Sequence, residues 1–140
     1  MYHRILVALD GSAASKLALH AAVELAATAQ ATVCALGVEE RLTQYEMAPA
    51  EIEEDKAEQD DWFAEIMDEA RREADERGVA LETAVQSGNA AQRIIQTARD
   101  GHYDLIVLGA KGHSVIRDFL LGTTTDRVAH HAPCSVLVVR

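Results

Sequence analysis

Length, composition and charge narrow the class of protein before any motif is considered. The 140 residues favour one domain over residues 1–140, and 49% hydrophobic with 4% aromatic residues predicts a core of aliphatic and alanine side chains. The net charge of −10 argues against DNA, RNA and anionic membranes as partners, because each of them is negatively charged.

The amino-terminal segment moves directly into a strand-like pattern. Residues 4–9, RILVAL, are mostly apolar without alternation, which is typical of a parallel strand covered on both faces. We therefore expect no signal peptide, and no apolar run approaches the roughly 20 residues that span a bilayer. Cys34 and Cys134 lie beside or within apolar runs, so we expect buried thiols in a reducing cytoplasm.

Helical spacing follows this first strand. Ala14, Leu17, Ala21 and Leu25 recur every three to four residues, which predicts a helix whose apolar stripe carries these side chains. A second apolar run, ATVCALGV at residues 31–38, predicts the next strand.

An irregular excursion over residues 39–50 is expected to lead into a second helix. Trp62, Ile66, Ala70 and Ala74 recur every four residues and predict its buried face. Because α/β proteins place functional loops at the carboxyl ends of strands, this excursion is a candidate site segment.

The charges of the second helix are ordered along its length. Residues 51–61 carry seven acids and one lysine, whereas Arg71, Arg72 and Arg77 follow later, an order that complements the helix dipole. Gly78 is expected to end the helix as a C′ glycine. A run of like charges is usually a solvated face.

The rest of the chain repeats the β-α alternation. Residues 79–85 partly alternate and suit an edge strand, residues 91–98 have helical spacing, and residues 104–109 form another apolar strand. The pattern predicts an α/β fold with a parallel sheet and helices on both faces. The last strand, Ser135–Val139, is an apolar edge that needs a cover, so we expect a homodimer through it.

A glycine-rich segment connects the last two strands. Gly109 ends the strand, Gly112 permits positive φ or a close backbone approach, and Gly122 precedes a helix. Thr123–Thr125 are expected to cap that helix, with Asp126 in its first turn. Exposed amides at a helix start, hydroxyl groups beside them and a glycine in front together predict an anion site.

Two alternatives to this anion site stay open. Taken singly, Gly109 is an ordinary strand-end glycine and Thr123 an ordinary cap, whereas Lys111 and Arg117 would add positive charge for an anion. The segment is not a P-loop, because Lys111 precedes its glycine, and the chain has no G-x-G-x-x-G or G-x-S-x-G motif.

Asp10, at the end of the first strand, has two interpretations. Its carboxylate could accept from ribose hydroxyls or an adenine amine, or hold a metal carried by phosphates. Alternatively, Asp10 only helps Ser12 and Ser15 to cap the first helix.

Together these motifs resemble the universal stress protein family, in its single-domain, ATP-binding branch. The resemblance rests on RILVALDGS at the start, the G-2x-G-9x-G-[ST] spacing from Gly109 to Thr123, and HHAPCSVLVV at the close. It implies an open five-stranded parallel sheet of order 3-2-1-4-5, an adenine nucleotide alpha hydrolase-like fold. It also implies ATP beside the first strand and dimerisation through the last strand.

The resemblance also implies roles for individual residues around the nucleoside. Ala8 and Asp10 are expected near the base and ribose, Val38 against adenine, and Leu108 with Gly109 on the other side. Mg²⁺ carried by the phosphates is a further expectation, with Asp10 as its protein neighbour.

The phosphates are expected at the glycine-rich segment. Gly112 and His113 would approach them through main-chain groups, and Gly122, Thr123 and Thr124 would bind them at the helix start. Threonines replace the family's commoner Ser-Val-Ser pattern, and their methyl groups would narrow the phosphate pocket.

The histidines do not predict a protein metal site. His130 and His131 precede Cys134, but adjacent helix residues point about 100° apart and no further Cys or His pair completes four ligands. No general base with a positioning partner is apparent, so we expect no catalytic residue and at most slow ATP hydrolysis.

Two functions from different classes follow. The first is a cytoplasmic, dimeric ATP-binding protein that acts in stress response or regulation. The second is a non-catalytic interaction module with a vestigial nucleotide pocket, which binds partners through the acidic face at Glu51–Asp61.

Overall fold

The computed structural model of the chain describes residues 1–40, 48–110 and 121–140. Its centre is a five-stranded sheet in which all neighbouring strands are parallel, in the order β3-β2-β1-β4-β5. The fold class and both edge positions expected from the sequence are confirmed. The strands are β1 (Arg4–Ala8), β2 (Thr32–Glu39), β3 (Leu81–Ser87), β4 (Leu105–Gly109) and β5 (Ser135–Val139).

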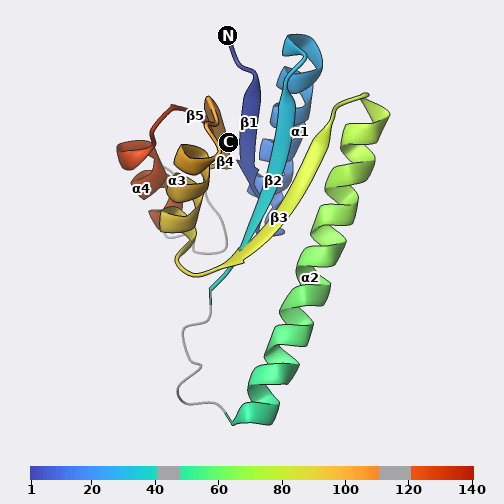
Figure 1. Cartoon of the computed structure of the whole chain (residues 1–140), viewed down its shortest axis with the longest axis vertical. Coiled ribbons are helices and arrows are strands. Elements are labelled where there is room, and N and C mark those ends of the chain that lie inside the picture. Colours follow the sequence, from blue (N-terminus) through green and yellow to red (C-terminus); the bar gives the residue numbers. More distant parts are fainter. Residues whose placement is uncertain (41–47, 111–120) are drawn as a thin grey trace.

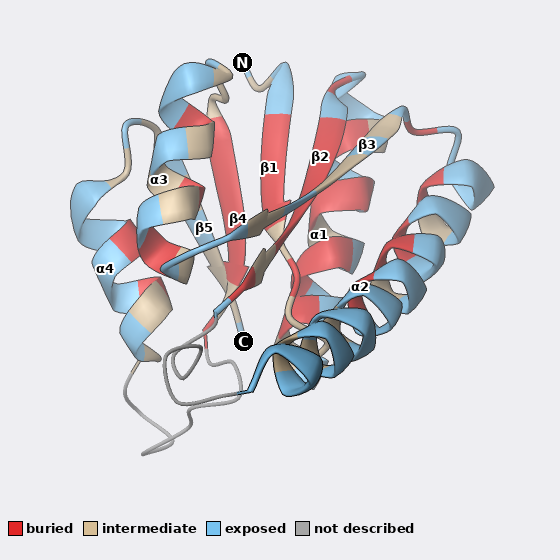
Figure 2. Cartoon of the chain, turned by 60° about the horizontal axis from the view of Figure 1, so that its bottom comes forward, coloured by how far each residue is buried: buried red, intermediate tan, exposed pale blue. Residues whose placement is uncertain are grey.

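Helices cover both faces of this sheet (Figure 1). α1 and α2 pack on one face and α3 and α4 on the other, so two hydrophobic clusters lie on opposite sides of the strands (Figure 2). The helices are α1 (Ala13–Ala29), α2 (Pro49–Glu76), α3 (Ala90–Asp100) and α4 (Thr123–His131).

β1 shows why the central strands lack alternation. Ile5 and Val7 belong to the cluster under α1 and α2, whereas Leu6 belongs to the cluster under α3 and α4. All three side chains are 0% exposed. A strand that is buried on both faces requires apolar residues at consecutive positions.

The predicted apolar stripe of α1 is wrong by about one position. Leu17 and Leu25 are 50% and 37% exposed. An alanine-rich helix has apolar residues all round, so spacing alone does not distinguish neighbouring stripes. The apolar side chains that α1 buries are Ala18, Leu19, Ala22, Val23 and Ala26.

The prediction for α2 is partly wrong for a related reason. The sequence has two pairs of adjacent apolar residues here, Trp62–Phe63 and Ile66–Met67, and helical spacing alone does not say which member of each pair faces the sheet. In the structure Phe63 and Met67 are buried, whereas Trp62 is 47% exposed. Ala70 and Ala74 are buried as expected. The helix extends from Pro49, and all of its buried residues lie in its carboxyl-terminal half.

The end of α2 follows the predicted glycine. Gly78 has φ +67, as expected for a C′ glycine. The Val79 amide then donates to the Ala74 carbonyl over 2.9 Å. Val79 therefore belongs to the closing turn of the helix, and β3 begins two residues later than the sequence suggested.

The two cysteines differ in burial. Cys34 on β2 is 6% exposed, and burial raises the pKa of its thiol. Cys134 is only partly buried, and both residues are free thiols. Within the described ranges, no helix combines the length and apolarity that a membrane span needs.

Candidate nucleotide-binding site

The candidate site lies where the carboxyl ends of β1, β2 and β4 meet, beside β1, where the chain stops adding strands on one side of β1 and continues on the other. A pocket of about 400 Å³ opens here between the starts of α1, α3 and α4 and one face of α2. Open parallel sheets place their ligands at this kind of switch point.

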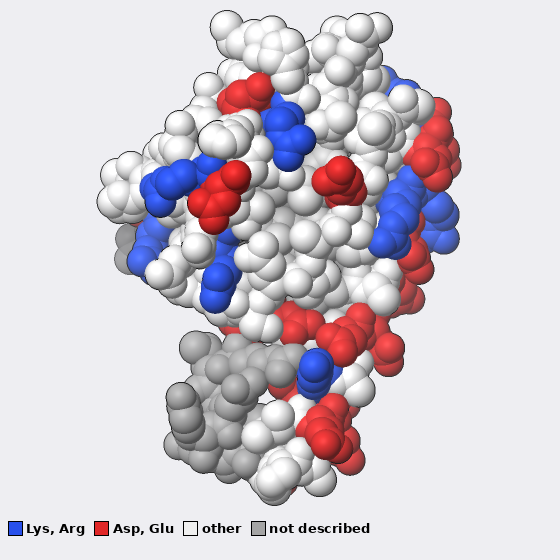
Figure 3. Space-filling view, viewed as in Figure 1, with Lys and Arg blue, Asp and Glu red and all other residues white. Residues whose placement is uncertain are grey.

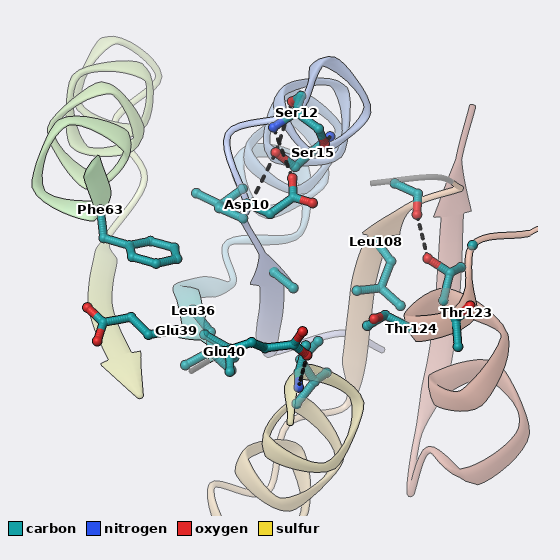
Figure 4. Close-up of a pocket in the computed structure, with 18 of the residues that line it drawn as sticks. Asp10, Ser12, Ser15, Leu36, Glu39, Glu40, Phe63, Leu108, Thr123 and Thr124 are labelled. Atoms are coloured by element: carbon teal, nitrogen blue, oxygen red, sulfur yellow. Dashed lines mark hydrogen bonds between the residues drawn. The ribbon is translucent and has the colours of Figure 1, made fainter. Parts of the chain in front are cut away.

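The turn after β1 is held by its own side chains (Figure 4). The Ser12 amide donates to Asp10 Oδ1 over 2.9 Å, and the Ser15 amide donates to Ser12 Oγ over 3.2 Å. Ser12 is therefore the N-cap of α1. Asp10 supports this cap, as the structural interpretation of the sequence proposed, and its side chain also lines the pocket.

α4 begins differently. Its N-cap is Gly122, not a threonine, so the prediction that Thr123–Thr125 cap the helix is wrong. Thr123 is already the first helical residue, and Thr125 Oγ1 instead donates to the Gly109 carbonyl over 2.7 Å. Because glycine has no side chain to accept from them, the first-turn amides of α4 have no side-chain cap, and Gly122, Thr123 and Thr124 line the pocket at this helix start.

Gly109 is required by close packing between β4 and α1. A Cβ added to it would lie 2.7 Å from the carbonyl carbon of Ala14 and from Ala14 Cβ. Such distances do not occur between non-bonded carbon atoms, so a side chain would push α1 away from the sheet. The strand-end interpretation of Gly109 is therefore correct, and Gly109 lines the pocket as well.

The structure brings eight of the ten predicted binding residues into this one pocket. Gly112 and His113 lie outside the described residues, as do Lys111 and Arg117. The eight that line the pocket are Ala8, Asp10, Val38, Leu108, Gly109, Gly122, Thr123 and Thr124.

Sequence reasoning missed the wall that α2 contributes. Gln59, Trp62 and Phe63 line the pocket from this helix, opposite the start of α4. Figure 4 shows the Phe63 ring on one side of the pocket and Thr123 and Thr124 on the other. The sequence signal here is the aromatic pair at positions 62 and 63, of which the helical spacing assigns only Trp62, to the buried face of α2.

Two glutamates at the end of β2 lie in the candidate site segment at residues 39–50, but their individual roles were not predicted. Glu39 is 5% exposed and lines the pocket, and Glu40 Oε1 accepts from the Ala90 amide over 2.9 Å at the start of α3. Glu40 thus caps a helix that is 50 residues away in the sequence, a partner that no local pattern reveals.

The described part of the pocket is acidic. Asp10, Glu39 and Glu40 contribute three carboxylates, and none of the described lining residues is Lys, Arg or His. A phosphate would therefore be bound through backbone amides, hydroxyl groups, a metal ion or residues outside the described ranges. Within those ranges, no group of three or more His, Cys, Asp and Glu side chains is arranged to hold a metal.

Comparison with known proteins decides the family. The family model described as "Universal stress protein family" matches residues 1–140. The chain belongs to the universal stress protein family. It is 34% identical to universal stress protein YxiE of Bacillus subtilis, over 100% of both chains.

Solved structures agree with this assignment. Universal stress protein UspA from Lactobacillus plantarum matches with a TM-score of 0.85 and 32% identity, covering 99% of this chain and 98% of that one. A family protein from Arabidopsis thaliana, solved with AMP bound, matches with a TM-score of 0.73 and 17% identity, covering 98% and 90%. At that identity the second likeness shows the shared fold.

Proposed function

We propose that this protein binds an adenine nucleotide, with ATP as its principal ligand, and acts as a nucleotide-dependent regulator in stress response. The observation that carries the proposal is the pocket itself. It joins base-sized apolar walls at Val38 and Leu108, a carboxylate at Asp10 and a helix start at Gly122 within about 400 Å³. That the Arabidopsis relative holds AMP supports the nucleotide class.

The phosphates are assigned to the start of α4. The first-turn amides and the positive end of the helix dipole both favour an anion there. Thr123 is exposed and Thr124 is half-buried beside these amides, so their hydroxyl groups add donors. Gly112 and His113 remain predictions for the same end of the ligand.

The nucleoside is assigned to the ends of β1, β2 and β4. Val38 and Leu108 provide apolar contact for the base, and the small side chain of Ala8 leaves space for it. The Asp10 carboxylate can accept from ribose hydroxyls. Because three carboxylates surround the pocket, we expect Mg²⁺ to accompany ATP and to lower the repulsion of its phosphates.

We propose binding without efficient catalysis. None of the described lining residues is a histidine, the commonest general base, and Asp10 and Glu40 serve the helix starts by accepting from the Ser12 and Ala90 amides. A general base instead needs a position close to the attacking water. At most slow hydrolysis is expected, and we place the protein in the cytoplasm, where its two free thiols would stay reduced.

Dimerisation through β5 is part of the proposal. β5 is a sheet edge, and its Leu137 is 36% exposed. An uncovered apolar edge strand pairs readily with another edge. Leu137→Lys should therefore shift the sedimentation coefficient from dimer to monomer, and a wild-type protein that sediments as a monomer would contradict this part.

One observation favours the alternative of an interaction module. The amino-terminal half of α2 buries no residue, and Figure 3 shows acidic side chains along this helix. The acids of that half are Glu51, Glu53, Glu54, Asp55, Glu58, Asp60 and Asp61. A solvated acidic helix could bind a basic partner without any nucleotide.

Equilibrium binding separates the two functions. Titration calorimetry of ATP with Mg²⁺ should show saturable binding near one nucleotide per chain, and mass spectrometry of purified protein should identify the released nucleotide. Absence of saturable binding would favour the interaction module.

A further inference from the structure

Trp62 occupies a position in the pocket wall that the core does not explain. It is the chain's only tryptophan, and it is 47% exposed while its neighbour Phe63 is 5% exposed. Phe63 packs over Gly37 on β2, where an added Cβ would collide with its ring. Phe63 therefore anchors α2 to the sheet, and Trp62 lies one residue away on the pocket wall.

The indole ring is held in place by the turn that carries Asp10. Gly11 has φ +82, and a Cβ added to it would lie 2.5 Å from Trp62 Cζ2. The ring thus packs directly on the backbone of Gly11, between Asp10 and Ser12. This contact holds the ring in place, and Trp62 nevertheless stays 47% exposed and lines the pocket.

The side chains near Trp62 suit the polar edge of a heterocycle. Gln59 lies about one helical turn before Trp62 on α2. The side-chain amide of Gln59 is held in one orientation because its Nε2 donates to Asp55 Oδ2 over 2.9 Å. Asp10 and Glu39 add carboxylate oxygens to the same pocket. Carboxylates accept from an exocyclic amine but repel phosphate, so this wall favours a base over a phosphate.

We propose that Trp62 is a base-binding residue of the pocket, against which the planar base of the nucleotide packs. This inference rests on the proposed function, because it gives the base of that same ligand a further contact on the α2 wall, in addition to Val38 and Leu108. Aromatic side chains stack on the flat face that every nucleotide base has, whereas an aliphatic side chain in the same place loses most of this interaction. The indole is already fixed by Gly11, so little ordering is needed when the base arrives.

The test compares AMP with ribose 5-phosphate, which lacks the base. Trp62→Leu should weaken AMP binding about tenfold, the loss expected for one stacking contact. Trp62→Phe should restore most of the AMP affinity. The dissociation constant of ribose 5-phosphate, which lacks a base to stack, should be the same in the wild type and both variants. Loss of AMP and ribose 5-phosphate affinity in equal proportion, or no loss of AMP affinity, would overturn the inference.

Fluorescence provides a second readout on the unmodified protein. Because Trp62 is the only tryptophan, its emission reports on this wall alone. AMP should change the emission with the same saturation curve that calorimetry gives, and ribose 5-phosphate should not. Unchanged emission at saturating AMP would overturn the role of Trp62 and leave the proposed function standing. Absence of AMP binding to the wild-type protein would overturn the inference about Trp62, and absence of both AMP and ATP binding would overturn the proposed function as well.

Discussion

The starts of α1 and α4 differ in how their first-turn amides are satisfied. Both helices follow neighbouring parallel strands, β1 and β4, and both border the same pocket. α1 is capped by the Ser12 hydroxyl, with Asp10 supporting the turn. α4 is preceded by Gly122, which has no side chain to offer.

Because of this difference, we expect the start of α1 to have a structural role and the start of α4 a ligand-binding role. The first turn of α1 is closed by the protein itself, so α1 fixes the position of Asp10. The first turn of α4 has no side-chain cap, which leaves its amides for the anion that we propose, and Thr125 Oγ1 attaches this turn to the sheet by donating to the Gly109 carbonyl. Gly109 joins the two, since it packs beneath Ala14 of α1 and accepts from Thr125 of α4.

Gly109→Ala should have the largest effect on stability, because it disturbs the starts of both α1 and α4. The added methyl group would meet the Ala14 backbone, and we expect a loss of about 3 kcal/mol in the free energy of unfolding. Urea denaturation measures the change. Gly78→Ala is the matched control. A Cβ added at Gly78 has nothing within 4 Å, and holding alanine at the positive φ of this position should cost only about 1 kcal/mol. Equal losses in the two variants would contradict the packing argument.

Gly122→Asp should give the start of α4 a side-chain cap like that of α1. The backbone at 122 has φ −61 and ψ 156, which any residue adopts, and Asp is a good N-cap. ATP affinity should fall at least tenfold, about 1.4 kcal/mol, because the carboxylate takes the amides and repels the phosphates. Thermal unfolding should show unchanged or slightly raised stability. A variant that binds ATP as tightly as the wild type would show that the phosphates lie elsewhere.

Thr125→Val tests how α4 is attached to the sheet. It removes the buried donor to the Gly109 carbonyl, and the part-buried acceptor left behind should cost about 1.5 kcal/mol. Chemical denaturation measures this loss. Thr123→Val, at an exposed position in the same turn, is the control and should change stability by less than about 0.5 kcal/mol.

Substitution of Ser12 gives the smallest expected effects. Ser12→Ala removes the cap of α1 and should cost about 1 kcal/mol, whereas Ser12→Gly should cost only a few tenths. The order of the two unfolding midpoints is the result to measure. If alanine were tolerated as well as glycine, the Ser12 hydroxyl would not be what closes the first turn of α1.

Local patterns in the sequence were sufficient for the strands, the helices and part of the pocket, and the family resemblance supplied the other predicted pocket residues. Strand order followed from the family resemblance and agreed with the edge positions that patterning gave at residues 79–85 and Ser135–Val139. Gly122 and Asp10 could be placed because each sits at the boundary between a strand or loop and a helix, where residue type reflects backbone geometry.

Contacts between distant segments could not be predicted in this way. The α2 wall depends on Phe63 packing over Gly37 and on Trp62 packing on Gly11, and each contact depends on the path of the helix across the sheet. Likewise, the acceptor of the Thr125 hydroxyl lies 16 residues earlier in the chain, so the sequence suggested a cap instead.

The most direct test of the central claim is the ratio of ATP to adenosine affinity in the wild-type protein and in Gly122→Asp. Titration calorimetry with Mg²⁺ present measures both ligands on both proteins. The account predicts that the wild type prefers ATP, and that the substitution removes this preference while adenosine affinity stays within about twofold. A preference for ATP that survives the substitution would contradict the assignment of the phosphates to the start of α4.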